Sequence, residues 1–562
     1  MKAKYILLLC TCVISLTACN ENKFLEEEPM SFYAPDNSYE TASQLQQAVN
    51  YLYSNFREIY FQPTDDGYQL ALFVSTDLFW WSWGEEKYNN YSAWVNPTYS
   101  YASSFWNNLY STIVNANEIL YRLDQTESVS EEQKKVFRGE ALFFRGFAYR
   151  YLANVYGGVP IETEHRTIPR RDYVRATRQE TWQQSAKDLE EAISLLPDIT
   201  ETKDGKVSKQ AAQHLISEVY ISLGEYDKAV TAATAVLSHN KIHLMTSRFG
   251  VDANKEGDVY YDLFRNGNIN RSEGNEETIL AWQFEYNNAG SPRYDYSSCN
   301  FLPRYRSAHC AAADGNGTVL AFSPSITAEK GGRGQGGLEM SYFLKQSIWG
   351  KDFDNDMRNS KYNIIRDVII DNPKAAGYGQ HLVADGWLVE SDTVGNFFPI
   401  MWKVTGNFPD ASYAKNSDGS YKLSAFGEHE LIHSGPSARA TYRDGYCFRA
   451  AETYLLRAEA YLGKGDKQKA ADDINAVRSR ANATPVTASE VDIDYILDER
   501  GRELVTEEQR AVTLFRLGKF VERSRKYSVY GSTVGDWQNL WPIPYSEIER
   551  NTAAVLEQNP GY

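Results

Sequence analysis

One short segment carries residue types that hold zinc and activate water in peptidases. His429, Glu430 and His433 follow the H-E-x-x-H spacing, in which two histidines on one helix face bind the metal and the glutamate acts as general base. Gly427 stands just before the segment and a Ser-Gly-Pro run follows it, which leaves too few residues for the long helix that this chemistry needs. We therefore interpret the segment as a surface loop and keep a zinc hydrolase as an alternative function.

A second segment has the acidic spacing of a calcium-binding loop. Asp352, Asp354 and Asp356 alternate as they do at the start of such a loop. Met357 stands where the loop requires glycine, and Asn363 stands where it requires glutamate. A solvated turn is the favoured interpretation, and a structural calcium site is the alternative.

No other catalytic motif can be assigned. The glycine-rich segment 330–337 lacks the Gly-Lys-Ser/Thr ending of a phosphate loop and is interpreted as a flexible loop. Carboxylates are too numerous for any pair to be singled out as the acid and base of a glycosidase. The sequence therefore predicts a binding protein without catalytic residues or a cofactor.

Aromatic residues supply a different chemistry, the binding of sugar rings. They make up 14% of the chain, which is high for an acidic chain, so some of them should be exposed for use. A sugar offers apolar C–H faces and a belt of hydroxyl groups, and its receptor needs flat aromatic platforms beside short polar side chains. Two stretches, 77–101 and 286–305, contain both kinds of residue.

The candidate ligand-binding residues are tryptophans of the first stretch and tyrosines of the second: Trp80, Trp81, Trp83, Trp94, Tyr294 and Tyr296. The further polar and aromatic residues of the two stretches are Asp77, Asn89, Asn90, Asn96, Tyr286, Asn287, Asn288, Arg293, Arg304 and Tyr305. For each ring the alternative is burial in the core. Trp80 and Trp81 are adjacent and tend to point apart, so one of the two is expected to be a platform. A ring face of about 50–100 Å² contributes roughly 1–2.5 kcal/mol, which gives three rings an affinity on the order of micromolar to millimolar.

The elements that must position these stretches are helical. Segments 217–236 and 458–477 align without a gap, and each predicts a helix hairpin with a left-handed glycine at its turn. The equivalent residues pair as Glu218 with Glu459, Tyr220 with Tyr461, Gly224 with Gly465, Lys228 with Lys469 and Ala229 with Ala470. This spacing resembles the tetratricopeptide repeat, whose units bury their apolar faces by stacking on neighbours.

Apolar periodicity predicts further helices, and composition divides the chain. The predicted helices are at about 43–60, 104–123, 130–156 and 181–196, with hairpins at 208–238 and 449–482 and a pair at 492–517. Between 241 and 446 the helical rhythm fails, and short strands or single turns are expected at 279–284, 364–370 and 397–404. The predicted fold is mostly α: a tetratricopeptide-like helical-hairpin scaffold, or alpha-alpha superhelix, at 43–240 and 447–562 that carries a loop-rich, ligand-binding subdomain at 241–446. Stretch 77–101 is expected to be a loop, and 540–562 an extended tail.

The N-terminus predicts export and a lipid anchor. Lys2 and Lys4 precede an apolar run at 5–16 that is too short to span a bilayer, as in a secretory signal. The run ends in Leu-Thr-Ala before Cys19, which resembles the lipobox of bacterial lipoproteins. We expect residues 1–18 to be removed, Cys19 to be acylated and residues 19–42 to form a tether.

Charge and cysteine content restrict the partners and the cross-links. The formal charge is −16, and because 1–18 hold two lysines and no acid, their removal leaves −18. This charge argues against a nucleic acid as a partner, and against an anionic lipid surface bound through a basic patch. Cys299 and Cys310 are expected to form a disulfide or to stay as buried free thiols.

Taken together, ordered motifs over nearly the whole mature chain resemble the SusD/RagB family of outer-membrane nutrient-binding lipoproteins. The motifs are Phe24-Leu25 with Pro29; Ile113 with Ala116-Asn117; Glu140-Ala141, Arg145, Asn154 and Tyr156-Gly157; Tyr261, Phe264 and Gly267-Asn268; Asp356 with Arg358; Arg449, Glu452, Leu456 and Ala458-Glu459-Ala460; Ile496 and Glu503; and Trp541 with Gln558, Asn559, Pro560, Gly561 and Tyr562. Thr552 departs from the proline that usually follows Asn551 in the family.

This resemblance implies a surface-exposed, glycan-binding lipoprotein of the outer membrane. It would sit as a lid over a SusC-like TonB-dependent transporter and pass oligosaccharides to it without catalysis. In the family, the binding arc draws its aromatic residues from the same two regions. Some relatives bind peptides instead, so a peptide receptor of the same architecture is the alternative.

Overall fold

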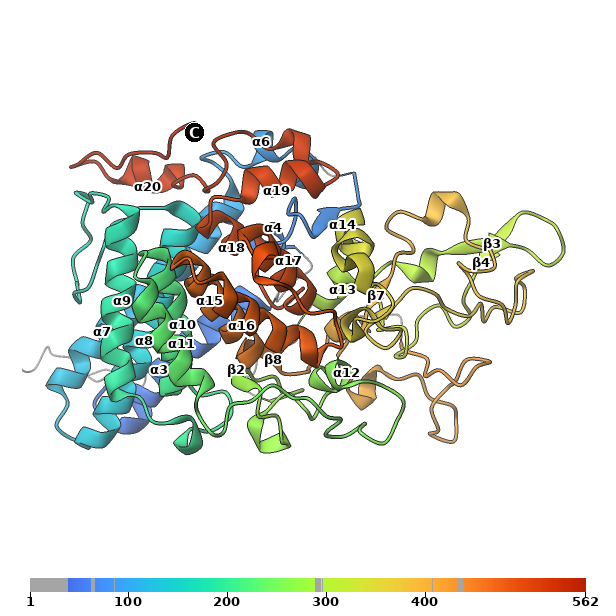
Figure 1. The fold of residues 1–562 in the computed structure, drawn as a ribbon, viewed down its shortest axis with the longest axis horizontal. Helices are drawn as coiled ribbons and strands as arrows, with labels where there is room; N and C mark the ends of the chain where they lie inside the picture. Colours follow the sequence, from blue (N-terminus) through green and yellow to red (C-terminus); the bar gives the residue numbers. More distant parts are fainter. Residues whose placement is uncertain are drawn as a thin grey trace, which may run out of the picture.

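The helices of the scaffold form one continuous row. The computed structural model describes residues 39–61, 66–84, 86–288, 295, 297–406, 408–432 and 438–562, so the predicted signal peptide, Cys19 and Tyr294 and Tyr296 lie outside the described residues. In Figure 1 the long helices lie on the left and in the centre, and the segments with few helices lie on the right. The main helices are α3 (Ala42–Tyr60), α7 (Ser100–Gln125), α8 (Glu131–Tyr156), α9 (Arg178–Leu195), α10 (Lys209–Ser222), α11 (Tyr226–Leu237), α15 (Ala450–Gly463), α16 (Lys467–Arg480), α17 (Ile493–Glu503), α18 (Arg510–Arg516) and α19 (Phe520–Tyr527). The predicted mostly-α, tetratricopeptide-like scaffold is confirmed.

Helix α8 is the centre of this scaffold. Ser130 caps it, as predicted, by accepting a hydrogen bond from the backbone N–H of Gln133. From Gly139 to Tyr156 every side chain is buried, because α7, α9, α18 and α3 all pack against α8. The helix ends at Gly157, which has a φ of 81°.

The two repeat hairpins, α10–α11 and α15–α16, make the same contacts twice. Gly224 and Gly465 turn the chain with φ values of 75° and 80°, in the left-handed region that glycine adopts at low cost. The Lys228 ammonium lies 5.2 Å from the ring centroid of Tyr220, and that of Lys469 lies 5.5 Å from the ring of Tyr461. The residues that align in the two repeats therefore make the same lysine–tyrosine contact in the structure.

The hairpins also pack directly on each other, through α11 and α15. Tyr226, the first residue of α11, covers Gly463 at the end of α15, where a Cβ atom would lie 2.3 Å from the tyrosine ring. Asp227 and Lys464 form an ion pair beside this contact. The repeats are thus neighbours in one stack, although more than 200 residues of chain separate them.

Short antiparallel strand pairs connect the segments outside the helix row. Strand β2 (Thr278–Trp282) pairs with β8 (Gly445–Arg449), which leads directly into α15. Strand β1 (Phe79–Trp81) pairs with β5 (Leu338–Met340) and so joins the tryptophan-rich stretch to the loop-rich segment. The remaining pairs are β3 (His309–Ala311) with β4 (Thr318–Leu320) and β6 (Ile364–Ile365) with β7 (Ile400–Met401). The division at residues 240 and 446 stays a prediction.

A buried network of ion pairs anchors the loop-rich segment on α17. Glu503 contacts Arg449, Arg480 and Arg358. Arg358 also binds Asp356 and Glu499. Replacing one charged residue of the network by a neutral one would leave its buried partner uncompensated. We expect this to lower the free energy of unfolding by about 3–5 kcal/mol.

This network corrects the interpretation of the acidic segment around Asp356. The solvated turn expected there is wrong, because Asp356 and Asp352 are buried and serve as partners of Arg358 and Arg478. The glycine-rich segment 330–337 is likewise packed rather than flexible: Lys330 is buried and pairs with Asp371 and Glu428. Its glycines permit this close packing.

Two smaller departures from the predicted elements are local. Stretch 77–101 contains β1 and two single-turn helices, α5 (Glu86–Asn89) and α6 (Tyr91–Trp94), and the C-terminal tail contains α20 (Tyr545–Arg550). Cys310 is a buried free thiol, so it forms no disulfide with Cys299.

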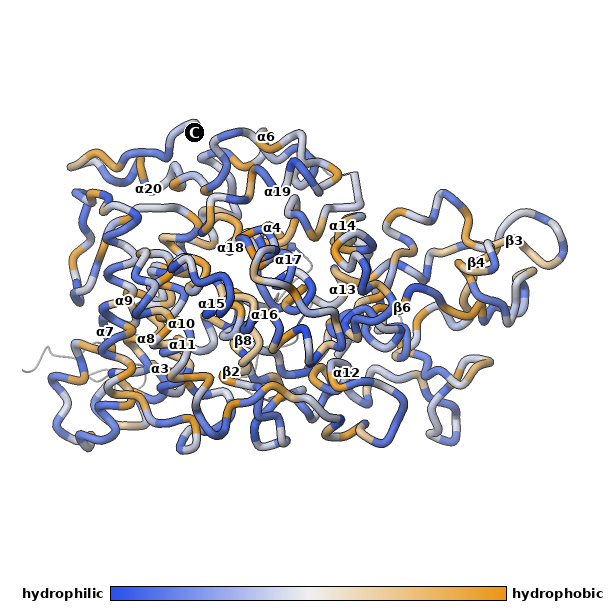
Figure 2. Tube along the Cα trace, viewed as in Figure 1, coloured by the Kyte–Doolittle hydropathy of each residue, from blue (hydrophilic) through white to orange (hydrophobic). Residues whose placement is uncertain are grey.

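Polar and apolar residues are interspersed along the helices in Figure 2, and in the described part of the chain no helix has the length and apolar character to cross a membrane.

Candidate functional site

Strand β1 places Trp80 and Trp81 in the interior. Their exposed fractions are 8% and 5%. The Trp81 ring lies 4.4 Å from that of Tyr88 and rests on Gly337, where a Cβ atom would lie 2.5 Å from it. The Trp80 ring lies 5.9 Å from that of Tyr530. Neither ring presents an open face, so the expectation that one of this pair is a platform does not hold for this conformation.

Trp83 and Trp94 are more accessible. Trp83 follows β1 and is partly buried, and Trp94 ends α6 with 41% of its surface exposed. The backbone around Trp83 is fixed on both sides: the Ser82 N–H donates to the carbonyl of Gly337 at 2.9 Å, and the Asn89 amide donates to the Trp83 carbonyl at 2.8 Å. Because the backbone that carries the ring is fixed, little backbone entropy is lost when a ligand stacks on Trp83.

The second predicted stretch meets the first at Trp83. The Arg304 guanidinium lies 5.4 Å from the centroid of the Trp83 ring, within the range of a cation–π interaction. Arg304 Nε donates to Asn396 Oδ1 at 3.1 Å, and the Arg304 backbone N–H donates to the Gly395 carbonyl at 2.9 Å. Gly395 has a φ of 69°, and this left-handed turn presents Asn396 beside the arginine.

Asn396 continues into a row of polar groups. Its amide donates to Asp392 Oδ1 at 2.7 Å, and Asp392 Oδ2 accepts from the backbone N–H of His309 at 2.6 Å. The His309 ring lies 3.0 Å from the same carboxylate oxygen and keeps 40% of its side chain exposed. We name these five residues, Trp83, Arg304, Asn396, Asp392 and His309, the Trp83 site. It combines one aromatic ring with the partly exposed polar side chains of Arg304, Asn396 and His309, which can hydrogen-bond sugar hydroxyl groups. The buried Asp392 holds Asn396 and His309 in place.

The other predicted polar and aromatic residues have mixed positions. Asp77 and Tyr305 are fully buried, and Asn96 binds the backbone of its own turn. Tyr286 is 48% exposed and meets Tyr442 edge to face at 5.0 Å. Asn396, Asp392 and His309 were not predicted, because no aromatic cluster or motif marks them in the sequence.

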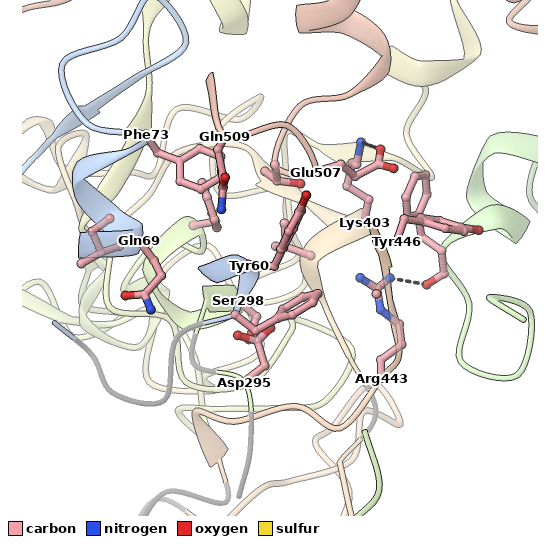
Figure 3. Close-up of a pocket in the computed structure, with 17 residues that line it drawn as sticks. Tyr60, Gln69, Phe73, Asp295, Ser298, Lys403, Arg443, Tyr446, Glu507 and Gln509 are labelled. Carbon is pink, nitrogen blue, oxygen red and sulfur yellow. Dashed lines mark hydrogen bonds and ion pairs between the residues drawn. The ribbon is translucent and has the colours of Figure 1, made fainter. Parts of the chain in front are cut away.

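A cavity of about 60 Å³ lies between the scaffold and the loop-rich segment (Figure 3). Lys403 and Arg443 are among its lining residues, and Lys403 Nζ donates to Glu507 Oε1 at 2.8 Å. Burial lowers the pKa of Lys403 to about 8 although Glu507 partly offsets it, and burial with the nearby Arg265 charge lowers the pKa of Arg443 to about 10. The cavity is far smaller than the 300 Å³ or more of usual ligand pockets, so it has room for water but not for a sugar ring.

A larger hollow of about 400 Å³ lies beside α7 and α20. Its lining includes Trp106, Tyr110, Tyr173 and Ile168. None of the predicted ligand-binding residues takes part in it. Its charged side chains are used in ion pairs, such as Glu162 with Arg166 and Arg170.

The H-E-x-x-H segment does not form a helix over its described residues. His429, Glu430 and Leu431 lie in extended backbone and make antiparallel bridges to Leu423, Thr327 and Tyr413. Zinc binding by this motif needs its two histidines one helical turn apart on the same face. His429 Nδ1 instead contacts Glu329 at 2.6 Å, and His433 lies outside the described residues. Within the part of the chain that the structure describes, no group of three metal-ligating side chains occurs.

Comparison with known proteins identifies one family. Residues 23–221 match a family model described as "Starch-binding associating with outer membrane", and residues 351–562 match one described as "SusD family". The chain is 23% identical to SusD-like protein P25 of Formosa agariphila over the full length of both chains. It is 26% identical to Starch-binding protein SusD of Bacteroides thetaiotaomicron, over 78% of this chain and 75% of that protein.

Solved structures show the same fold. A "Laminarin binding SusD-like protein" superposes with a TM-score of 0.65 at 20% sequence identity, covering 93% of this chain and 100% of that one. A SusD superfamily protein from Parabacteroides distasonis has a TM-score of 0.66 at 20% identity, over 92% of this chain and 99% of that one. At this level of identity the likeness concerns the fold.

Proposed function

The chain belongs to the SusD/RagB family, and we propose that it is a surface receptor for oligosaccharides on the outer membrane. It captures glycans and delivers them, uncleaved, to a SusC-like TonB-dependent transporter. Two of the similar proteins carry starch and laminarin in their names, which supports a glycan as the ligand class. The predicted acylation of Cys19 supplies the anchor.

The observation that carries this proposal is the contact between Trp83 and Arg304. It joins two stretches that each contain aromatic and polar residues, and it sets the Trp83 ring beside Arg304, which donates to Asn396. Asp392 links Asn396 to His309. A sugar ring stacked on Trp83 would gain roughly 1–2.5 kcal/mol from apolar contact. Hydrogen bonds to its hydroxyl groups would then set orientation and specificity.

Calorimetry or affinity gel electrophoresis with a panel of oligosaccharides and polysaccharides tests the proposal. We expect one glycan class to bind with a Kd between micromolar and millimolar, and Trp83→Ala to weaken it about tenfold or more. Trp537→Ala is the control, because Trp537 is a tryptophan with an exposed fraction of 43% and is not part of the Trp83 site. Unchanged affinity in Trp83→Ala, with Trp94→Ala equally silent, would reject the site.

Peptides are added to the same panel, and the bound oligosaccharide is analysed for cleavage. Binding of peptides but of no glycan would favour the peptide receptor. Chromatography of the bound oligosaccharide after long incubation checks that its chain length is unchanged, and shortened products would show hydrolysis instead of capture.

The location and the partner have their own test. Cys19→Ser should move the protein from the outer-membrane fraction to the soluble fraction, because acylation at this thiol is the proposed anchor. Co-purification of a TonB-dependent transporter with the wild-type protein, in a detergent extract of glycan-grown cells, is the expected result for the delivery step. An unacylated wild-type N-terminus in mass spectrometry would contradict the anchor.

A further inference from the structure

Beyond Trp83, the loop-rich segment brings four arginines to one place. Arg304 and Arg306 flank the first residue of a single 3₁₀ turn at Tyr305–Ser307. Arg306 Nη1 donates to the carbonyl of Gly334, and its Nη2 donates to Gln335 Oε1 at 3.3 Å. The residue before Gly334 is Arg333, so the glycine-rich segment places a third arginine near Arg304 and Arg306.

The fourth arginine comes from the end of the loop-rich segment. The Arg333 backbone N–H donates to the carbonyl of Ala438 at 2.7 Å, and Arg439 follows Ala438. The side chains of Arg304, Arg306, Arg333 and Arg439 are all partly exposed to solvent. Burial and the positive charges of Arg333, Arg304 and Arg439 together lower the pKa of Arg306 to about 10. The other three arginines therefore lie close enough to Arg306 for their charges to act on its guanidinium group.

The charge of Arg304 and Arg306 is not balanced by a carboxylate. In the described part of the chain their side-chain hydrogen bonds go to the neutral acceptors Asn396 Oδ1, Gly334 O and Gln335 Oε1, and neither arginine forms an ion pair. The fully buried Arg358 and Arg449 each meet two or more carboxylates, whereas Arg178 and Arg443, like Arg306, bind neutral acceptors. In a chain of net charge −16, the positive charges of Arg304 and Arg306 are stabilised when a ligand brings a negative charge.

The neighbouring carboxylates are already engaged. Asp392 accepts from His309 and Asn396. Glu339 accepts from Lys345 and from the backbone N–H of Gly395. A guanidinium binds a carboxylate or sulfate through two parallel hydrogen bonds and stays charged at all physiological pH values, so the two arginines suit an anionic ligand group better than a hydroxyl group.

We propose that the Trp83 site selects oligosaccharides bearing anionic groups, either uronic acid carboxylates or sulfate esters. One sugar ring stacks on Trp83, and the anionic group of the same or the next residue contacts Arg304 and Arg306. This inference rests on the proposed function, since it names the class of glycan that the receptor takes.

Calorimetry with three oligosaccharide sets of equal length tests the inference: neutral β-glucan or α-glucan oligomers, oligogalacturonates and sulfated galactan oligomers. At about 20 mM salt, we expect at least one anionic set to bind about tenfold more tightly than the neutral sets. Raising the salt to about 500 mM should remove most of that advantage, because exposed charge pairs are screened. Neutral oligomers should show little salt dependence.

Two variants locate the effect. Arg306→Gln should weaken anionic binding about tenfold and should weaken neutral binding less. Arg171→Gln is the matched control, because Arg171 is an exposed arginine between α8 and α9 and outside the site, and it should leave both affinities unchanged. If Arg306→Gln fails to fold, the salt dependence of the wild-type protein still decides the question.

The outcomes separate the two proposals. A neutral set that binds as tightly as both anionic sets, without salt dependence, would overturn the anionic preference and leave the receptor function intact. Binding of no oligosaccharide from any set would reject the receptor function itself. Preference for one anionic set alone supports the inference and identifies the group as a carboxylate or a sulfate.

Discussion

Asp77 and Arg510 form a buried two-hydrogen-bond ion pair, with distances of 2.9 and 2.7 Å, although 433 residues separate them in the chain. Arg523 Nε contacts the same carboxylate at 2.6 Å. Asp77 lies just before β1 and is fully buried, so it fixes the tryptophan-rich stretch to α18 and α19. The expectation that Asp77 faces a ligand is therefore corrected: Asp77 is a buried ion-pair partner that fixes the strand carrying Trp81 and the chain that leads to Trp83.

Acid should destabilise the protein through carboxylates of this kind. Burial alone raises the pKa of Asp77, but the charges and hydrogen bonds of Arg510 and Arg523 outweigh it and lower the pKa to about 2. At Glu218, too, burial raises the pKa and nearby arginine charges, mainly that of Arg150, outweigh it, so the pKa of Glu218 is about 2. Because these folded-state values lie below the unfolded ones, the stabilisation is complete above about pH 5 and is lost as pH falls toward 2, at roughly 2–3 kcal/mol for each group. Melting temperatures measured from pH 7 to pH 2.5 should fall steeply below about pH 4.5.

Asp77→Asn isolates one contribution to this profile. At pH 7 it should cost about 3–5 kcal/mol, because it leaves two buried arginines short of a charge partner. Asp124→Asn is the control: Asp124 pairs with Arg138 at the surface, with 63% of its side chain exposed, and should cost about 1 kcal/mol or less. Equal losses in the two variants would contradict the role assigned to Asp77.

Trp81 and Trp83 are two residues apart and should respond differently to removal. Trp81→Ala deletes a core ring and should lower stability by about 3–5 kcal/mol, with affinity reduced only as far as the site is distorted. Trp83→Ala should lower stability less, because its ring is partly exposed, and should remove most glycan affinity. Urea unfolding and calorimetry on the same preparations measure both effects. Loss of binding in Trp81→Ala with an unchanged unfolding midpoint would show that the buried ring is the platform.

The helical scaffold was predictable because its signals are local. Apolar periodicity and caps such as Ser130 depend on residues three or four apart, and the repeat alignment placed Gly224 and Gly465 at real left-handed turns. The ion pairs of Asp77 and Asp356 were not predictable. Arg510, the partner of Asp77, lies 433 residues away. Asp356 pairs with Arg358 only two residues on, but the burial of this pair depends on Glu499 and Glu503 of α17. A single sequence therefore makes these acids look like solvated or ligand-facing groups.

The candidate site was predictable in part for the same reason. Composition marked the stretches that contain Trp83 and Arg304, because tryptophan and arginine clusters are visible along the chain. It could not tell that Trp81 packs inward, since the burial of β1 depends on β5 more than 250 residues later. Asn396 reaches the site through the left-handed turn at Gly395, and nothing near Asn396 in the sequence indicates that proximity.

The two repeat glutamates should be energetically coupled through one arginine. Arg516 binds Glu459 with two contacts of 2.7 Å, and its Nε lies 3.6 Å from Glu218 Oε1. Glu218→Gln and Glu459→Gln should each destabilise the protein, and the double variant should deviate from the sum of the two by about 0.5–3 kcal/mol. A double-mutant cycle from urea unfolding measures this. Additivity within about 0.3 kcal/mol would show that Arg516 does not link the repeats.

The contact between Gly463 and Tyr226 gives a prediction whose sign depends on the background. In an open helix position, Gly463→Ala would stabilise α15 by up to about 1 kcal/mol through helix propensity. Here the new Cβ would lie 2.3 Å from the Tyr226 ring, so the two hairpins must move apart and we expect a net loss of about 1–3 kcal/mol. Tyr226→Ala removes the obstacle, and in that background Gly463→Ala should be stabilising. Unfolding midpoints of the four proteins measure both signs, and a gain from Gly463→Ala in the wild-type chain would mean that α11 and α15 are not held together at this contact.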